Sequence, residues 1–447
     1  MNKKLTALFL LLPASLYFLF FPVGNSHARV YIDIYAARIQ KIRVAVPDFK
    51  NKSEYGQHPD VASSSASIIR HDLKVIGYFH IVNPLSYLEN PQIAPVSPER
   101  IDYTDWTVLN APYLINGEYK TRNGKITVTA NLISIYSQKL LFSETLKGKD
   151  DDYRYLSNKI ADDIVGFLTG IKGPFTTKVF FVGEKGGEKN IFMMDFGGHR
   201  VKRVTANSSI NIFPHPSPDG SRVAYVSFKS GNPAVYVRDL SRGSAKRLDL
   251  PGPADFVSWS PTGLKLAVAI TKDYYNTEIY TINADGTGLK KLTSSWGINT
   301  SPSFSPDGKR IAFVSDRGGS PQIYVMNSDG SQKERITFNG SNYNTSPAWS
   351  PDGKKIAFTS IVNGVLQVFI MNSDGSDERQ VTSTPFSAQH PAWTRDSRII
   401  TFDTEINGRE GLYMIDVNES GMMRLVPFLD PPQENYYSAQ WTARASH

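Results

Sequence analysis

The sequence predicts a small α/β domain followed by an all-β six-bladed β-propeller that is closed by the C-terminal strand. Apolar residues at helical spacing alternate with short strand-like runs in the first third of the chain, which indicates a mixed α/β unit. In the remainder, a motif of the form "SPDGKRIAFVS" returns at a nearly constant interval, as in repeat architectures. The first repeat lacks its leading strand, and a single copy of that strand ends the chain.

The first 28 residues are expected to be a secretory signal peptide. Lys3 and Lys4 precede a long apolar run, and Ser26 and Ala28 form a small-x-small pattern that favours cleavage after Ala28. An uncleaved anchor is the alternative, because the apolar run approaches the ~20 residues of a spanning helix. The 447 residues include no cysteine, so we expect neither disulfides nor a lipid-modified cysteine, and an extensive core must supply the stability.

Residues 29–172 are expected to form the α/β domain. "IRVAVPDF" and "FHIVN" are typical of strands, and the segment between them has apolar residues at helical spacing. A second helix is predicted in "RYLSNKIADDIVGFLTGI", with one apolar face turned inward and Asp162 and Asp163 outside. "GIKGP", residues 170–174, is interpreted as the linker to the second domain.

Residues 173–447 are expected to form the propeller. Pro218, Pro261, Pro306 and Pro351 occupy the same place in the motif and are spaced 43, 45 and 45 residues apart. Short runs rich in Ile, Val, Tyr and Phe, separated by Asp-Gly turns, indicate four antiparallel strands in each repeat. A period of this length with four strands is typical of a propeller blade.

The two ends of the repeat region are expected to complete one blade together. Residues 178–205 align without gaps on residues 310–337 but have no first strand before them. The missing strand is "SAQWT", residues 438–442, which matches the corresponding runs of the other repeats. Pairing of the two segments gives six blades and removes two open sheet edges that would invite aggregation.

No enzymatic chemistry is indicated by the sequence. It lacks the Gly-x-Ser-x-Gly elbow of serine hydrolases and the His-Glu-x-x-His pair of zinc proteases, and "NSDGSD" lacks the closing glutamate of a calcium loop. The net charge of +7 raises nucleic acid as a partner, but the basic residues are spread over the repeats without a cluster. We therefore expect no catalysis, cofactor, metal, nucleic acid or small-molecule substrate, and a monomer.

The repeated "SPDG" is interpreted as a turn, because proline, aspartate and glycine each favour one turn position. The aromatic residue before it (Trp259, Phe304, Trp349, Trp393 or Trp441) is expected to pack between blades. Function is expected where the repeats differ, in the segments that lead into the innermost strands around the channel. Such polar and aromatic residues either form a recognition mouth for another protein or simply cap the strands. The residues expected there are Phe213, His215, Asn299, Thr300, Ser301, Tyr343, Asn344, Thr345, Gln389, His390, Tyr436 and Tyr437.

Taken together, the signal segment, the α/β domain, the junction "FLTGIKGPF" and the six-bladed propeller with "SPDG…IAF" repeats resemble the TolB family of the Tol–Pal envelope system over essentially the whole mature chain. The resemblance implies a non-enzymatic periplasmic adaptor that supports outer-membrane integrity and constriction during cell division. It also implies binding of the peptidoglycan-associated lipoprotein (Pal) at the propeller mouth, through the first ten residues named above, and contacts with other outer-membrane or peptidoglycan-linked proteins.

The resemblance further implies binding of TolA through the mature N-terminus, whose alternating apolar residues suit addition to a sheet edge. An ordinary first strand is the alternative. Family members carry a His and a Glu in the mouth, and the corresponding positions here are near Pro253 and at Ser301, so the lipoprotein contacts are expected to differ. A propeller hydrolase and a carbohydrate-binding envelope protein are the rival functions. The residues expected to contact TolA are Arg29, Val30, Tyr31, Ile32, Asp33 and Ile34.

Overall fold

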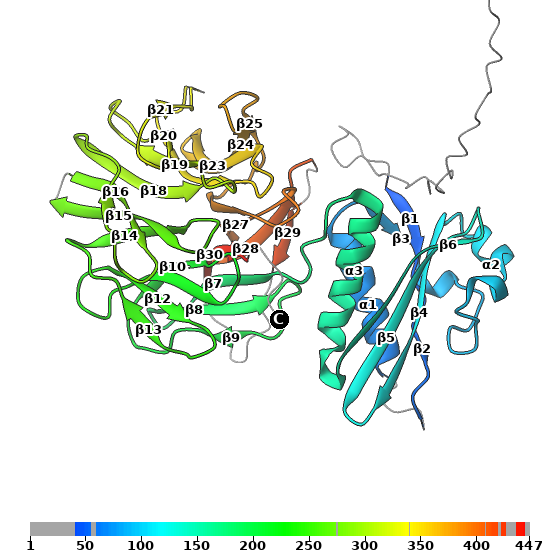
Figure 1. The fold of residues 1–447 in the computed structure, drawn as a ribbon. Helices are drawn as coiled ribbons and strands as arrows, with labels where there is room; N and C mark the ends of the chain where they lie inside the picture. The colour runs from blue at the N-terminus through cyan, green and yellow to red at the C-terminus, as the bar shows by residue number, and fades with distance from the viewer. Residues whose placement is uncertain are drawn as a thin grey trace, which may run out of the picture.

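Figure 1 shows an α/β unit and a β-propeller joined by a single linker. The computed structural model describes residues 41–54, 60–273, 276–338, 340–406, 408–418, 422–425 and 435–442. The expected signal peptide, residues 1–28, and the expected TolA-binding segment, residues 29–34, lie outside the described residues. In the described part of the chain, no helix has the length and apolar character needed to cross a membrane.

The α/β unit is built on one mixed sheet with the strand order β3-β1-β4-β5-β6, in which β2 also pairs with β4. β1 runs parallel to β3 and β4, whereas β4, β5 and β6 are antiparallel. The strands are β1 (Ile42–Ala45), β2 (Lys50–Asn51), β3 (Phe79–Ile81), β4 (Tyr113–Arg122), β5 (Lys125–Ser134) and β6 (Lys139–Lys149). The helices are α1 (Asp60–Val75), α2 (Tyr103–Thr107) and α3 (Tyr153–Thr169), with 3₁₀ turns η2 (Pro84–Ser86), η3 (Pro98–Arg100) and η4 (Asp150–Asp152).

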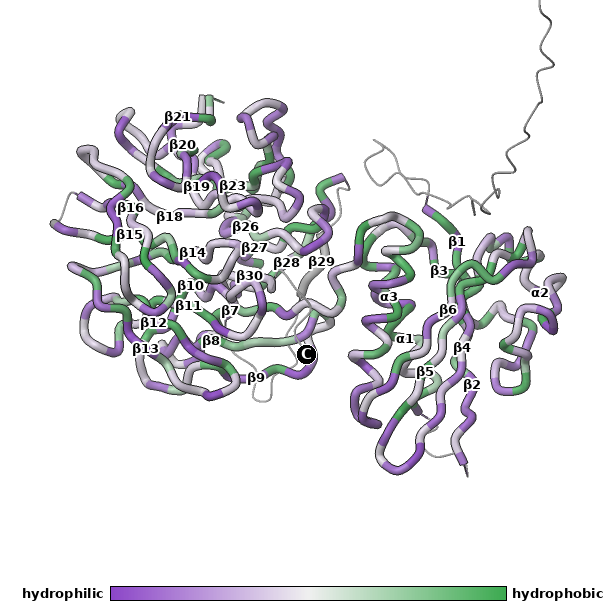
Figure 2. The backbone as a smooth tube through the Cα atoms, viewed as in Figure 1, coloured by the Kyte–Doolittle hydropathy of each residue, from purple (hydrophilic) through white to green (hydrophobic). Residues whose placement is uncertain are grey.

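Alternate residues of the sheet serve two different cores, as the two-residue period of a strand requires. Val44 and Ile115 pack with the apolar faces of α1 and α3, whereas their neighbours Ala45 and Leu114 pack with Trp106 of α2. α3 alternates hydrophobic and hydrophilic bands in Figure 2, as expected for an amphipathic helix. The long helices therefore cover the face of the sheet that is turned toward the propeller (Figure 1).

The described strands of the propeller form six antiparallel four-stranded blades, as the repeats predict. Blades 3 and 4 are continuous in one eight-stranded sheet, because β16 and β18 pair over two residues. In blade 1 the strands are β30 (Asn435–Trp441), β7 (Lys178–Lys185), β8 (Glu188–Asp195) and β9 (Lys202–Arg203). In blade 2 they are β10 (Asn211–Pro216), β11 (Arg222–Ser227), β12 (Ala234–Asp239) and β13 (Ala245–Arg247). In blade 3 they are β14 (Ala254–Trp259), β15 (Lys265–Asp273), β16 (Asn276–Asn283) and β17 (Lys290–Lys291).

The remaining blades follow the same pattern, with the innermost strand first. In blade 4 the strands are β18 (Gly297–Phe304), β19 (Arg310–Ser315), β20 (Gln322–Asn327) and β21 (Glu334–Arg335). In blade 5 they are β22 (Asn344–Trp349), β23 (Lys355–Val362), β24 (Val365–Asn372) and β25 (Arg379–Gln380). In blade 6 they are β26 (Ala388–Trp393), β27 (Ile399–Ile406), β28 (Arg409–Asp416) and β29 (Met422–Leu425).

Ring closure by the C-terminal strand is confirmed. β30 pairs antiparallel with β7, with Tyr437 opposite Val182 and Trp441 opposite Val179. Trp441 also donates from its indole nitrogen to the Thr401 hydroxyl of blade 6, at 3.0 Å. The last strand therefore belongs to the first blade and contacts the last one, so the ring has no open edge at the junction.

The "SPDG" turns are architectural, as expected. In blade 4 the Ser305 hydroxyl donates to Asp307 at 2.5 Å, and the Lys309 backbone N–H donates to the same carboxylate at 3.0 Å. The aromatic residue before the turn packs between blades: Trp259 donates to the carbonyl of His215 in the preceding blade, at 2.8 Å. The repeated motif thus holds each hairpin and seals each blade against its neighbour.

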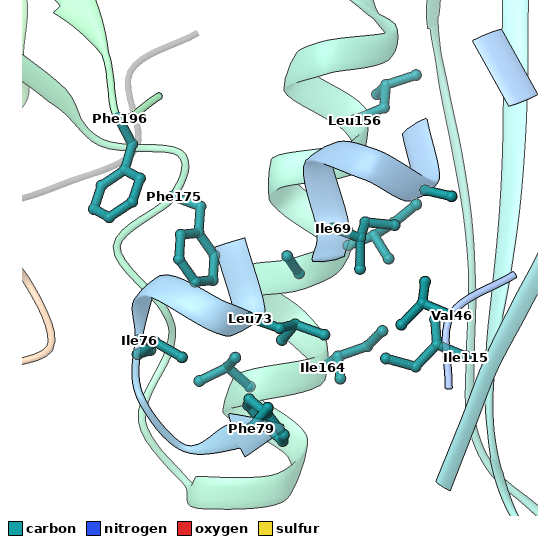
Figure 3. Close-up of a cluster of buried hydrophobic side chains, with 14 of the residues drawn as sticks. Val46, Ile69, Leu73, Ile76, Phe79, Ile115, Leu156, Ile164, Phe175 and Phe196 are labelled. Atoms are coloured by element: carbon teal, nitrogen blue, oxygen red, sulfur yellow. The ribbon is translucent and has the colours of Figure 1, made fainter. Parts of the chain in front are cut away.

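One expectation for the helices is wrong, because Asp162 of α3 is 2% exposed. Its carboxylate accepts hydrogen bonds from the backbone N–H groups of Phe175 and Thr176, at 2.8 and 3.0 Å, and from the Thr176 hydroxyl. Helical periodicity alone places Asp162 outside, but the linker folds back over this face of α3 and needs an acceptor there. Figure 3 shows Phe175 of the linker beside Phe196 of the propeller, next to the helix core.

Candidate functional site

The innermost strands of the six blades surround the channel of the propeller. They are β30, β10, β14, β18, β22 and β26, and each contacts the next around the ring. All six lose their pairing register with the second strand of the blade near their middle. A break of this kind, a β-bulge, locally reverses the direction of a side chain.

The residue at the break points into the channel in every blade. Phe213, Phe256, Ser301, Ser346, His390 and Ser438, here called the bulge ring, occupy equivalent positions and line a single cavity of about 100 Å³. Five of the six adopt a positive φ, between 49° and 53°. This conformation is costly for residues other than glycine, at about 1 kcal/mol or more each, and it is concentrated at binding sites.

The bulge ring combines aromatic and hydroxylic side chains, with its two phenylalanines in neighbouring blades. The Phe213 and Phe256 rings lie 4.4 Å apart between centroids, and His390 approaches Phe213 at 6.0 Å. The other members are three serines. The ring can therefore hold an apolar group against its two phenylalanines while its serines exchange hydrogen bonds.

The pKa values of the two histidines that line the cavity are shifted in opposite directions. The pKa of His390 is raised, because the charge and hydrogen bond of Asp403, at 3.0 Å from Nδ1, outweigh the desolvation of the imidazole. Asp403 is 1% exposed and also accepts the backbone N–H of Ser438 at 3.1 Å. Burial lowers the pKa of His215 to about 4, and its Nδ1 has no hydrogen-bond partner among the described residues. Near neutral pH, His215 is thus uncharged and His390 protonates more readily.

The structure divides the residues expected at the mouth into three groups. Phe213, Ser301 and His390 belong to the bulge ring, and His215 lines the same cavity. Asn299 and Asn344 are fully buried; their side-chain amides donate to Glu278 at 3.1 Å and Gln322 at 2.9 Å, which belong to the preceding blades. These two asparagines therefore join blades. Thr300, Tyr343, Thr345, Gln389, Tyr436 and Tyr437 lie outside the lining of the cavity.

Sequence reasoning missed three members of the bulge ring, Phe256, Ser346 and Ser438. A signal for the ring was present, because Pro214, Pro302, Pro347 and Pro391 each follow a bulge residue. Proline donates no ladder hydrogen bond and occurs inside sheets mainly at edges and bulges. The proline that recurs in four of the innermost strands therefore marks the position of the β-bulge.

Large apolar side chains are exposed around the mouth face, which is the face where the six innermost strands begin. They come from the loops that lead into those strands and from the first residues of β18, and antiparallel blades bring these segments to one face. Trp296 is 90% exposed and Phe338 is 73% exposed. The others are Ile210, Ile298, Tyr343 and Phe386. Large apolar side chains gathered on one face favour a surface that binds another protein.

The described residues include no candidate metal site, because no three of their His, Cys, Asp or Glu side chains are grouped so that they could hold an ion. The site consists of one small cavity, a pair of histidines with different protonation behaviour, and an apolar rim. This arrangement suits recognition of a protruding side chain or peptide segment.

The chain is similar to TolB proteins in both of its parts. Residues 165–346 and 341–447 match the family model described as the TolB beta propeller domain, and residues 30–141 match the TolB amino-terminal domain. The Tol-Pal system protein TolB of Desulfosudis oleivorans is 31% identical over 269 residues, which cover 60% of this chain and 61% of that protein. The Protein TolB homolog of Chlorobium chlorochromatii is 32% identical over 287 residues, or 64% of each chain.

The chain thus matches somewhat less than two thirds of the length of these curated relatives. The crystal structure of TolB from Acinetobacter baumannii is similar over a longer stretch. It covers 91% of this chain and 97% of its own, with a TM-score of 0.76 at 26% identity.

Proposed function

This chain belongs to the TolB family, and from that premise we propose that it is a periplasmic adaptor that binds Pal at the mouth face of its propeller and TolA through its N-terminal segment. It is a Tol–Pal system protein, and TolB proteins are non-enzymatic components of that system. Support of outer-membrane integrity and of constriction during division is the cellular role that we propose for the two contacts.

The observation that carries the Pal proposal is the bulge ring beneath an apolar rim. Trp296 and Phe338 expose most of their side chains on the mouth face. Burial of aromatic anchors of this size dominates the energy of many protein interfaces. Below them, the cavity offers serine hydroxyls and the His390 imidazole for polar contacts that set the orientation of a partner. The rim would supply affinity and the ring would supply specificity.

The Pal proposal is tested by calorimetry with the soluble domain of the lipoprotein. We expect the double variant Trp296→Ser/Phe338→Ser to bind at least about tenfold more weakly, because each side chain is expected to be an interface anchor. The control is Leu264→Ser, which removes an apolar side chain that is 69% exposed beside the turn of blade 3, on the opposite face. Unchanged binding by the double variant, or an equal loss in the control, would place the interface elsewhere.

The TolA proposal concerns residues 29–34, and it rests on the family and on the alternation of Val30, Ile32 and Ile34 in the sequence. An extended segment with this alternation can add to the edge of a sheet in a partner. Deletion of residues 29–34 from the mature chain should abolish binding of the TolA periplasmic domain and leave Pal affinity unchanged. Retention of TolA binding by the shortened chain would refute this part of the proposal.

A further inference from the structure

A second cavity, of about 430 Å³, lies between the α/β unit and the propeller. One wall comes from the end of β6, η4 and the first turns of α3, and the other from the linker, β7, β8 and β9. Its volume falls within the range of small-molecule sites, which are frequent where two domains meet. Nothing in the adaptor function described above requires it.

Positive charge converges on this cavity. Lys147 reaches it from the α/β unit, and Lys178, Arg200 and Lys202 reach it from the propeller. The ammonium groups of Lys147, Lys178 and Lys202 make no hydrogen bond or ion pair with the described residues. The pKa of Lys178 is lowered by burial and by the neighbouring charges of Lys202 and Arg200. Mutual repulsion of this kind disfavours the empty site and is relieved by an anion.

The lining holds two carboxylates, Asp152 and Asp195, which offset only part of this positive charge. Asp195 accepts the backbone N–H of His199 at 2.7 Å. Asp152 accepts the backbone N–H of Lys149 at 2.9 Å and lies 4.0 Å from Arg200. Four cations face two carboxylates, so the lining keeps an excess of positive charge.

Besides Asn158, Thr176 and Thr177, the lining includes a set of apolar and aromatic side chains. Leu156, Phe175 and Met194 are at most 4% exposed, and Tyr155 and Met193 also line the cavity. A bare inorganic ion would leave this surface without contacts. The combination instead fits a molecule that carries an anionic head on an apolar or aromatic body.

We propose that the interdomain cavity binds an amphipathic oxyanion, with a phosphate or carboxylate head among the lysines and an apolar body against Tyr155 and Leu156. Because the lysines come from both units, the bound anion joins the α/β unit to the propeller. Arg200 already makes one such connection, through a hydrogen bond of 2.7 Å to the carbonyl of Asp151. The ligand adds a second connection at the same junction.

The first test uses phenyl phosphate, inorganic phosphate and phenol as probes of the full mature chain, by calorimetry and thermal unfolding. Phenyl phosphate should bind saturably at millimolar concentration, more tightly than either fragment, and raise the Tm. Its affinity should fall as salt is added, because the contacts are ionic. No saturable binding of phenyl phosphate, or equal affinity for phenol, would overturn the proposal.

Variants locate the site. Lys178→Gln/Lys202→Gln should weaken phenyl phosphate by at least about tenfold, since each charge-assisted contact is worth that much. Lys265→Gln/Lys309→Gln makes the same change of charge at exposed positions of the propeller and should have no effect. Met193→Trp, which fills the cavity without changing its charge, should also weaken binding and covers the case in which the first variant does not fold. Equal affinity in the cavity variants and the control would refute the site.

Hydrogen exchange tests the bridging role. On addition of phenyl phosphate, residues 147–158 of the α/β unit and residues 193–202 of the propeller should both exchange more slowly. Protection of only one of these segments would refute the bridge. Dihexanoyl phosphatidylglycerol, used as a monomer, and benzoate then separate a lipid phosphate from a small carboxylate as the source of the head group. Binding of the phosphatidylglycerol more tightly than phenyl phosphate assigns a lipid phosphate, and tighter binding of benzoate assigns a small carboxylate.

Discussion

Replacement of Asp162 by asparagine should flatten the pH dependence of stability. Asp162 is almost completely buried under the linker, where it accepts the backbone N–H groups of Phe175 and Thr176. Burial raises the pKa of this carboxyl to about 7, although these hydrogen bonds and the Thr176 hydroxyl favour the charged form. The linker between the two units is therefore held by a group that titrates near neutrality.

The sign and size of the effect follow from proton linkage. The folded chain holds the Asp162 proton more tightly than the unfolded chain, so this contribution to stability is fully present below the ordinary pKa of 3.8 and is lost as the pH rises through about 7. From about pH 5 to about pH 8, a shift of this size removes about 2.5 kcal/mol. Asparagine stays neutral throughout, so the stability of Asp162→Asn does not fall in this way as the pH rises.

The assay is urea unfolding of wild type and Asp162→Asn across this pH range, followed by tryptophan fluorescence and circular dichroism. The difference between their free energies of unfolding should change by about 2.5 kcal/mol, whereas slopes from other buried groups, such as Asp416 with a pKa of about 6, cancel. The control is Asp374→Asn, because the hydrogen bond from the Ser376 hydroxyl lowers the pKa of this exposed carboxyl and leaves no titration in the range. A pH-independent difference for Asp162→Asn would refute the reasoning.

Three further predictions concern the propeller. Asp307→Ala should lower the free energy of unfolding by about 1 kcal/mol, as for one lost turn hydrogen bond, and leave Pal affinity intact in calorimetry; a large binding defect at unchanged stability would contradict this. Trp441→Ala should cost about 3–5 kcal/mol in urea unfolding, because it empties the contact with Phe196 and loosens ring closure, and a loss below 1 kcal/mol would show that closure does not depend on it. NMR titration should give His390 a pKa above 6.5 that falls in Asp403→Asn, and an unshifted value would exclude the pair as the cause.

The blades could be predicted from the sequence because their determinants are local. Each Asp-Gly turn and each apolar run lies within a few residues of its partner strand, and the regular spacing of Pro306 and Pro351 multiplies the signal. Ring closure was also predictable, because the first repeat lacks a first strand before Lys178 and "SAQWT" is the unpaired copy of that strand. Burial of Asp162 was not, because it depends on how the linker crosses α3.

The bulge ring was predicted only in part, because the prediction was drawn from the segments that lead into the innermost strands and did not include the β-bulge. Adjacent residues such as Thr300 and Ser301 point to opposite faces of a strand, and a one-residue change of register decides which of them faces the channel. The structure puts Ser301 and Ser346 in the cavity and leaves Thr300 and Thr345 outside its lining. The interdomain cavity had no sequence signal, because Lys147 and Lys178 approach each other only after the two units pack.

The composition of the bulge ring separates the scaffold from its function. The break in register is common to all six innermost strands, so the geometry of the ring belongs to the blade itself. The side chain at the break is not common: phenylalanine occurs in two neighbouring blades, histidine in one and serine in three. A catalytic role would need a few groups to meet around one reacting atom, whereas six equivalent positions with both apolar and polar side chains present a contact surface. Substitutions of the ring residues should therefore change partner affinity in proportion to the contact that each loses, with no single member whose loss alone abolishes binding.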